Sequence, residues 1–438
     1  MNYVSGEVGA RFRALWRSLE PIGRDGQTGG YLRHGWNAAE LACREWFREE
    51  AADRELAVRE DGNGNLFAWW GDPDAGDAVL TGSHLDSVPQ GGAFDGPLGI
   101  VSALLAVDLL RERGVAPRRP IVVAAFAEEE GSRFGLACLG SRLLTGVTDA
   151  DAARALTDRD GVTLARAVTA AGGDPAALGP DAALLGRFAC FVELHLEQGR
   201  ALVDLDAPVG LATAIWPHGR WRFEFTGEAN HAGTTLMVDR RDPMLTYAFT
   251  VLAANKEARL AGGHATMGRV TVVPNATNAV PGHITAWLDA RAADQATLEK
   301  IIAGVRAKAG DRATRDATTV TVTPESLSPV VDFDPALRTR LRTALARVLP
   351  GDTGIPVLAT GAGHDAGVLS AFLPTAMIFV RNPTGVSHAP AEHATDADCA
   401  AGVTALAAAL EDLACGEPPS SPASAAGPAA GGGERPWD

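Results

Sequence analysis

Five imidazole and carboxylate side chains that follow apolar segments are the candidates for chemistry. They are His84 and Asp95 in TGSHLDSVPQGGAFDG, Glu130 at the end of an EEE triplet, His195 in ELHLEQG, and His388 in SHAPAEH. Nitrogen and oxygen donors of this kind suit zinc, manganese or cobalt. Five donors exceed what one tetrahedral catalytic zinc with an open position uses. They suit two ions that share a carboxylate, which Asp95 can supply from its loop.

Acidic residues beside these donors suggest supporting roles. Asp86 follows His84 by two residues and is expected to hold the far ring nitrogen and fix its tautomer. Glu128, Glu129 and Glu130 repel one another at the end of an apolar strand, a cost that two divalent cations would remove. With Glu130 on a metal, Glu129 can reach a water as general base and later pass the proton to a leaving nitrogen. A single histidine in a turn is usually only solvated, so the joint placement carries the prediction.

Apolar runs that alternate with helix-like segments must position these side chains. The runs AVLTGSH, PIVVAAFA, CFVELHLEQG and PTAMIFV begin at residues 78, 120, 190 and 374 and indicate buried strands. Strands that alternate with helices predict an α/β domain, with a mixed, largely parallel sheet and helices on both faces. Open sheets of this class build their sites at the carboxyl ends of the strands, where these polar residues stand.

A change of texture between about residues 210 and 324 predicts a second domain. WRFEFTG, ATMGRVTVV and HITAWLDARA alternate apolar and polar residues, and helical stretches intervene at 244–260 and 295–308. One-sided strands with two helices predict a small α+β domain with an antiparallel sheet. We therefore expect a discontinuous catalytic domain over 1–212 and 326–415, an inserted domain over 213–325, and a disordered Pro-, Gly-, Ala- and Ser-rich tail over 416–438.

Composition and charge exclude several kinds of partner. The net charge of −15 argues against nucleic acid and anionic membranes, since both require a basic face. A small anionic substrate needs only one local arginine. The five cysteines are scattered, have no CxxC pair and fit a reducing compartment. The sequence has no apolar run long enough for a bilayer and no secretion signal at its N-terminus, so we expect a cytoplasmic location.

Eight motifs together resemble the M20-type binuclear metal amidohydrolases. In chain order they are TGSHLDSVPQGGAFDGPLG, AEEEGSRFG, ELHLEQG, GEANHAGTT, RRDP, PNATNAVPG, GAGHDA and SHAPAEH. They are most similar to the branch that contains N-carbamoyl-L-amino-acid hydrolases, allantoate amidohydrolases and β-ureidopropionases, over about residues 7–413. The resemblance implies two divalent cations per subunit, zinc or manganese, with cobalt or nickel as further possibilities.

The resemblance also implies a role for each matched residue. The metal positions of the family fall on His84 and His195 for one cation, Glu130 and His388 for the other, and Asp95 as the bridge. The catalytic base falls on Glu129. The inserted domain matches the family's dimerisation or lid domain, which implies a homodimer, and its His231 would stabilise a developing oxyanion. Substrate-binding positions fall on Gln198, Asn278 and Arg291, and a guanidinium can bind a substrate carboxylate through two hydrogen bonds. Without the resemblance, Asn278 would be interpreted as a turn former and Arg291 as a surface charge.

The activity that the resemblance implies is metal-dependent hydrolysis of a linear carbamoyl C–N bond in a small carboxylate substrate. The leading expectation is conversion of an N-carbamoyl-L-amino acid to the L-amino acid, carbon dioxide and ammonia. The nearest alternative is an allantoate amidohydrolase. An aminoacylase-type amidase and an inactive binding protein on the same scaffold are more distant alternatives.

Several residues depart from the motifs or lie beside them. Leu236 stands where relatives often carry proline, and residues 216–218 read Trp-Pro-His where small residues are expected. Arg220 is adjacent to the place where allantoate enzymes tend to carry an arginine. We expect it to point the other way along the strand, which favours a carbamoyl amino acid. His364 and Asp365 in GAGHDA are expected to support loops near the site rather than bind metal.

Overall fold

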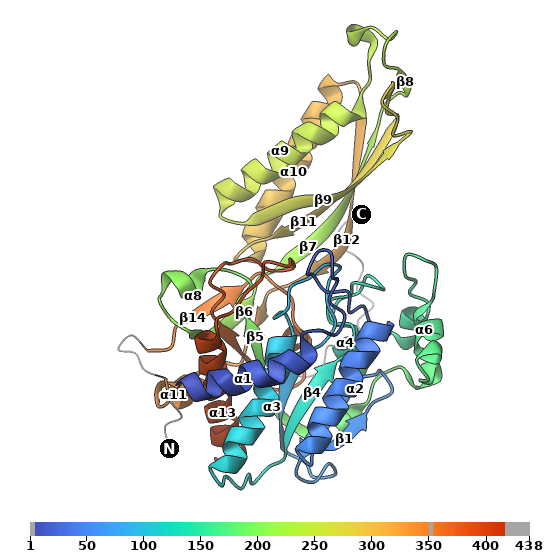
Figure 1. The fold of residues 1–438 in the computed structure, drawn as a ribbon. Coiled ribbons are helices and arrows are strands. Elements are labelled where there is room, and N and C mark those ends of the chain that lie inside the picture. Colours follow the sequence, from blue (N-terminus) through green and yellow to red (C-terminus); the bar gives the residue numbers. More distant parts are fainter. Residues whose placement is uncertain (1–4, 350–353, 417–438) are drawn as a thin grey trace. The chain divides into compact units, whose positions relative to one another are not determined.

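The computed structural model describes residues 5–349 and 354–416 (Figure 1). The chain divides into two compact units, of which unit 1 comprises residues 1–213, 333–358 and 363–438 and unit 2 comprises 214–332 and 359–362. The corresponding expectation from the sequence was an insertion over 213–325. The tail expected over 416–438 lies outside the described residues, apart from Gly416.

A mixed nine-stranded sheet forms the centre of unit 1, although the short strand β13 and the last residues of β6 and β14 fall in the residue ranges of unit 2. The strand order is β1-β2-β4-β3-β5-β15-β6-β13, with β14 beside β6. The four central strands β4, β3, β5 and β15 run parallel, whereas β1, β2 and β6 join antiparallel. The bounds are β1 Ala57–Glu60, β2 Leu66–Trp70, β3 Ala78–His84, β4 Ile121–Phe126, β5 Phe188–Leu196, β6 Val209–Ile215, β13 Val331–Asp332, β14 Val357–Thr360 and β15 Thr375–Val380. The predicted mixed α/β class is confirmed.

Helices pack on both faces of this sheet. On β5, Cys190, Val192 and Leu194 join the main core with one set of helices, while Glu193 between them bonds to the opposite helix α12. This alternation is the period of a strand. The first set is α1 (Ser5–Leu19), α2 (Ala38–Asp53), α3 (Pro97–Glu112), α11 (Pro335–Ala346) and α13 (Asp396–Cys415). The shorter helices are α4 (Leu139–Thr145), α5 (Ala150–Arg154), α6 (Leu164–Ala170), η1 (Pro175–Ala177), α7 (Ala182–Leu185), α8 (Ala201–Asp204) and α12 (Asp365–Leu369).

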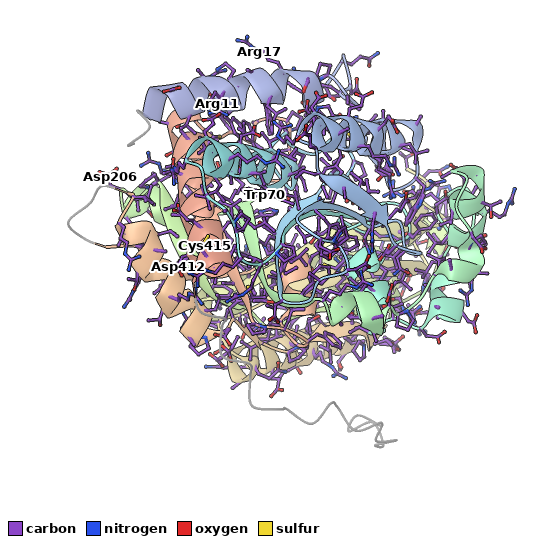
Figure 2. All side chains as sticks on the ribbon, turned by 90° about the horizontal axis from the view of Figure 1, so that it is seen from below. Arg11, Arg17, Trp70, Asp206, Asp412 and Cys415 are labelled. Carbon is purple, nitrogen blue, oxygen red and sulfur yellow. The ribbon has the colours of Figure 1, made fainter. Side chains whose placement is uncertain are left out.

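The helix α3 anchors the loop that carries Asp95. It begins directly after Gly96 with Pro97 at its first position, where the missing N–H of proline costs nothing. Almost all of its side chains are buried in the main core, and α1 packs across α3 and α13 (Figure 1). Charged side chains line the outer surface of this layer, among them Arg11, which pairs with Glu112 at 2.7 Å (Figure 2). A buried, apolar α3 therefore gives the Asp95 loop a rigid end.

Unit 2 holds a four-stranded antiparallel sheet in the order β12-β7-β11-β9. Its elements are β7 His218–Thr226, α9 Pro243–Ala261, β9 His264–Val273, β11 His283–Arg291, α10 Gln295–Arg315 and β12 Thr319–Ser328, with the short pair β8 (Asn230–His231) and β10 (Ala279–Val280) and a 3-10 turn η2 (Met237–Asp239). Alternate residues of β7 and β11, from Trp221 and from Ile284 onward, pack against α9 and α10. The antiparallel sheet with two helices expected from the sequence is thus confirmed.

The described helices are all too short or too polar to cross a lipid bilayer.

Candidate metal centre

The five candidate ligands gather at one edge of the unit 1 sheet. His84 is the last residue of β3, and His195 lies near the end of the adjacent parallel strand β5. Asp95, Glu130 and His388 stand in the loops that follow β3, β4 and β15. These four strands are neighbours in the sheet, so their carboxyl ends meet. This is the position where open α/β sheets build sites.

Each oxygen of the Asp95 carboxylate faces a different pair of side chains. Oδ1 lies 3.5 Å from His84 Nε2 and 3.2 Å from His195 Nε2. Oδ2 lies 3.3 Å from His388 Nε2, which is itself 3.6 Å from Glu130 Oε2. In each of the two groups, the ligand atoms lie within 4.8 Å of one another. The arrangement consists of two three-residue groups that share one carboxylate.

The histidine hydrogen bonds fit a metal on the Nε2 atoms. His84 Nδ1 lies 3.1 Å from the backbone oxygen of Asp86, and His195 Nδ1 lies 2.9 Å from that of Leu196. A carbonyl oxygen can only accept, so each Nδ1 carries the proton and each Nε2 presents its lone pair. Both Nε2 atoms are buried without a hydrogen-bond partner among the described residues. Buried orphaned nitrogens that face a carboxylate suit a cation.

Asp86 supports the centre through two different groups. Its backbone oxygen makes the bond to His84, whereas its carboxylate is 3.6 Å from the ring. The carboxylate accepts hydrogen bonds from the backbone N–H groups of Glu129 (3.1 Å) and Glu130 (3.0 Å). The sequence suggested only the contact with the histidine. Asp86 also fixes the loop on which two of the acidic candidates stand.

The buried ligand side chains shift one another's pKa values. Burial alone would raise the pKa of Asp95, but the neighbouring imidazoles of His195, His388 and His84 hold it well below its usual range. The hydrogen bond with Asp95 raises the pKa of His388 to about 9. Burial, followed by the charge of Asp95, raises the pKa of Glu130 to about 7. A divalent cation binds deprotonated carboxylates and imidazoles, so its binding at these groups is expected to release protons.

Glu129 lies beside His84, in the first group of candidate ligands, but is not itself a member of that group. Its Oε2 is 3.7 Å from His84 Nε2, and its Oε1 accepts a hydrogen bond from the Cys138 thiol at 3.3 Å. Burial raises the pKa of Glu129 well above its usual range, against the charge of His84. A buried carboxyl group with a raised pKa beside candidate metal ligands is suited to taking up and returning a proton.

The structure brings Gln198 and Ser387 to the shared carboxylate. Gln198 Nε2 donates to Asp95 Oδ2 at 2.7 Å, and the Ser387 hydroxyl donates to the same oxygen at 3.1 Å. The carbonyl oxygen of Gln198 is buried without a partner among the described residues. Sequence reasoning placed Gln198 at the substrate and missed Ser387, whose only signal is that it directly precedes His388.

His364 belongs to a third close group, with Glu193 and His195. Both oxygens of Glu193 are already used, since they accept from the Ser83 hydroxyl (2.9 Å) and the Ala366 amide (2.9 Å). Glu193 is therefore fixed by other partners, and the His364 ring packs against the His195 ring with centroids 4.4 Å apart. The signal for Glu193 was its spacing, because two residues along a strand share one face.

Three of the predicted site residues, His231, Asn278 and Arg291, lie in unit 2. His231 pairs with Ala279 in the β8–β10 ladder, and the next residue, Ala232, donates to the Asn278 carbonyl at 3.0 Å. Arg291 ends β11, where its guanidinium binds both oxygens of Asp289 at 2.8 and 3.2 Å. Unit 2 thus brings His231 and Asn278 together, while Arg291 stands at the end of another strand.

The unusual Trp-Pro-His segment at 216–218 is packed within unit 2. The Trp216 ring stacks on His264 with centroids 5.6 Å apart, and its carbonyl lies 3.0 Å from His218 Nδ1. Arg220 is exposed on the face of β7 opposite to the buried Gly219, as strand alternation predicts. These contacts give the segment a structural role.

Comparisons of the sequence and of the structure with known proteins point to the same family. The profile of Peptidase family M20/M25/M40 matches residues 80–412. An N-carbamoyl-L-amino acid amidohydrolase of Geobacillus stearothermophilus is 36% identical, over 92% of this chain and 98% of that protein. The allantoate amidohydrolase of Escherichia coli is 34% identical, over 90% and 96%. A crystal structure of a hydantoinase/carbamoylase family amidase from Burkholderia vietnamiensis superposes with a TM-score of 0.83 at 31% identity, over 94% and 98%.

Proposed function

The chain belongs to peptidase family M20/M25/M40, and from that premise we propose that it hydrolyses the carbamoyl C–N bond of an N-carbamoyl-L-amino acid. The family and the hydrolase class expected from the motifs are confirmed. Enzymes of this family depend on metal ions, and this chain has candidate metal-binding residues. The observation that carries the proposal is the Asp95 carboxylate, with one oxygen facing each of two ligand pairs.

We assign two cations to the two groups of ligands. His84 and His195 would hold one, Glu130 and His388 the other, and Asp95 would serve both. Imidazole and carboxylate donors suit zinc and manganese, and also cobalt and nickel. When bound, such a pair supplies a Lewis acid for the carbamoyl oxygen and makes a water more acidic.

Glu129 carries the protons in this proposal. Its carboxylate takes a proton from the attacking water and returns it to the departing amine nitrogen. Its burial supports this role, since a raised pKa allows the same group to act first as base and then as acid. The thiol of Cys138 occupies one oxygen and leaves the other, Oε2, on the side of His84.

Unit 2 supplies groups suited to the oxyanion and to the substrate carboxylate. His231 Nδ1 accepts from the amides of Gly233 (2.9 Å) and Thr234 (3.2 Å), so its Nε2 carries the proton and can donate to a developing oxyanion. We assign the carboxylate of the substrate to Arg291, whose guanidinium the Asp289 carboxylate already orients. Asn278 and, from unit 1, Gln198 are assigned to the amide groups of the substrate.

We further propose a homodimer formed through unit 2. The helix α9 exposes Leu245, Phe249 and Leu252 at the spacing of one helical face. The neighbouring strand β9 is an edge of its sheet and exposes Val270 and Val273. An apolar helix face beside an unpaired strand edge is suited to a second copy of the same chain.

Ammonia release from a substrate panel tests the proposed activity. The purified protein, supplied with zinc or manganese, should release ammonia from N-carbamoyl-L-amino acids. Hydrolysis of allantoate is the second candidate, favoured by the similarity to the Escherichia coli enzyme. A higher kcat/KM for allantoate would decide for that alternative. No ammonia from either class of substrate would remove both assignments.

A further inference from the structure

A buried carboxylate outside the ligand groups holds the backbone of the Asp95 loop. Glu392 is only 4% exposed. Its Oε1 accepts hydrogen bonds from the backbone N–H groups of Phe94 at 2.8 Å and Asp95 at 2.9 Å. Two hydrogen bonds to one buried acceptor oxygen fix the backbone at residues 94 and 95.

The loop is shaped around this carboxylate. A Cβ at Gly92 would collide with the carboxyl group of Glu392, so only glycine allows the backbone to pass this closely. On its other side the loop is fixed by Phe94, whose ring stacks on Trp16 with centroids 4.6 Å apart. Between Gly92 and the start of α3, Glu392 therefore binds the backbone N–H groups, and Phe94 packs its ring into an apolar contact.

The segment that carries Glu392 also contacts the side chain of Asp95. Ser387 donates to Asp95 Oδ2 at 3.1 Å, and His388 Nε2 lies 3.3 Å from the same oxygen. A turn bond from the Glu392 amide to the Ala389 carbonyl, at 3.0 Å, closes the segment. Residues 387–392 thus hold Asp95 by its backbone and its carboxylate while supplying a ligand of their own.

We propose that Glu392 is a positioning residue of the metal centre, which fixes Asp95 between the two ligand pairs so that both cations can bind to it. This inference rests on the proposed metal site. Without the carboxylate of Glu392, the backbone N–H groups of Phe94 and Asp95 lose their acceptor. Asp95 then keeps the contacts of its carboxylate with Gln198 and Ser387, but its backbone N–H is no longer fixed. The shared ligand then moves relative to both pairs, so the affinity for both cations falls.

A titration of metal-free protein with Co²⁺, followed by its visible absorption, tests the proposal. Glu392→Ala should bind Co²⁺ about 10–100-fold more weakly, the usual cost of losing a residue that orients a metal ligand. Glu392→Gln keeps an acceptor oxygen for both amides, so its affinity should remain close to that of the wild type. Glu392→Asp keeps a carboxylate but is one methylene too short to reach both amides, so it should also bind Co²⁺ more weakly. This variant replaces Glu392→Ala in the test if the alanine variant does not fold.

Asp61→Ala is the matched control. Asp61 Oδ1 likewise accepts two backbone amides, those of Asn63 (2.9 Å) and Asn65 (2.8 Å), in a glycine-containing loop that carries no candidate ligand. This variant should lower the melting temperature and leave Co²⁺ affinity unchanged. Wild-type affinity in both Glu392→Ala and Glu392→Asp, or an equal loss in Asp61→Ala, would overturn the proposal. Absence of Co²⁺ binding by the wild type would instead overturn the metal site and the proposed function.

Discussion

At the scale of single residues, the central feature is that one carboxylate serves two sets of imidazole and carboxylate donors. Asp95 contacts His84 and His195 through Oδ1 and His388 through Oδ2. Its pKa is held well below its usual range by these histidines, although burial opposes this. The negative charge is therefore kept at the one point where two cations would share it.

Asp95→Asn should remove both cations rather than one. The amide keeps the size of the side chain but loses the charge and presents N–H groups to one ligand pair. His388→Ala, which alters only the second group, should lose mainly one cation. Metal content of the purified variants, measured by plasma mass spectrometry, compares the two. Retention of one full equivalent in Asp95→Asn would contradict the shared role.

Glu129→Gln should lower kcat by about 10²–10⁴-fold, the usual contribution of a general acid–base group. Metal content should stay at the wild-type level, because Glu129 lies outside the two groups of ligands. Initial rates and metal analysis on the same preparation separate the two effects. A variant that keeps wild-type turnover would show that another group moves the proton.

At the scale of elements, the connection from β3 to α3 sets the geometry of the first ligand pair. Gly96 has a positive φ of 85°, and a Cβ there would collide with the imidazole of His84. The turn between His84 and α3 therefore combines a ligand, a glycine that packs on that ligand, and the buried start of a helix. Small changes in this turn are therefore expected to displace the His84 ring and so to weaken cation binding.

Gly96→Ala should weaken cation binding and lower the free energy of unfolding by about 1–3 kcal/mol from backbone strain. Gly114→Ala is the control, because Gly114 also has a positive φ of 71° but has open space around its Cβ. The control should show a backbone cost without a change in metal affinity. Denaturant unfolding and a metal titration measure both quantities. Equal metal affinity in the two variants would refute a role for the turn in placing His84.

The sequence predicted the elements of the site better than their surroundings. The strands β3, β4, β5 and β15 were recognisable because buried parallel strands are continuous apolar runs. The strands β1, β2 and β6 were not specified, since β1 is only four mostly exposed residues and the order of strands depends on distant pairing. Glu392 was missed because an acidic residue in a turn usually reads as solvated, and its burial follows from a contact 297 residues away.

At the scale of the whole molecule, the apolar surface of unit 2 predicts self-association. Leu252→Glu places a charge on the exposed face of α9, where the wild-type side chain is 70% exposed. We expect this variant to be a monomer and the wild type a dimer in light scattering after size exclusion. Val147→Glu, at an exposed apolar residue of unit 1, should leave the dimer intact. A monomeric wild type would remove the proposed homodimer.

The most direct test of the account is the dependence of ammonia release on the amount of metal. Protein stripped by a chelator should be inactive toward an N-carbamoyl-L-amino acid. Activity should rise with added zinc or manganese and reach its maximum at two equivalents per chain, because we assign one cation to each of the two groups around Asp95. Full activity of the stripped protein, or saturation at a single equivalent, would contradict a pair of cations on one shared carboxylate.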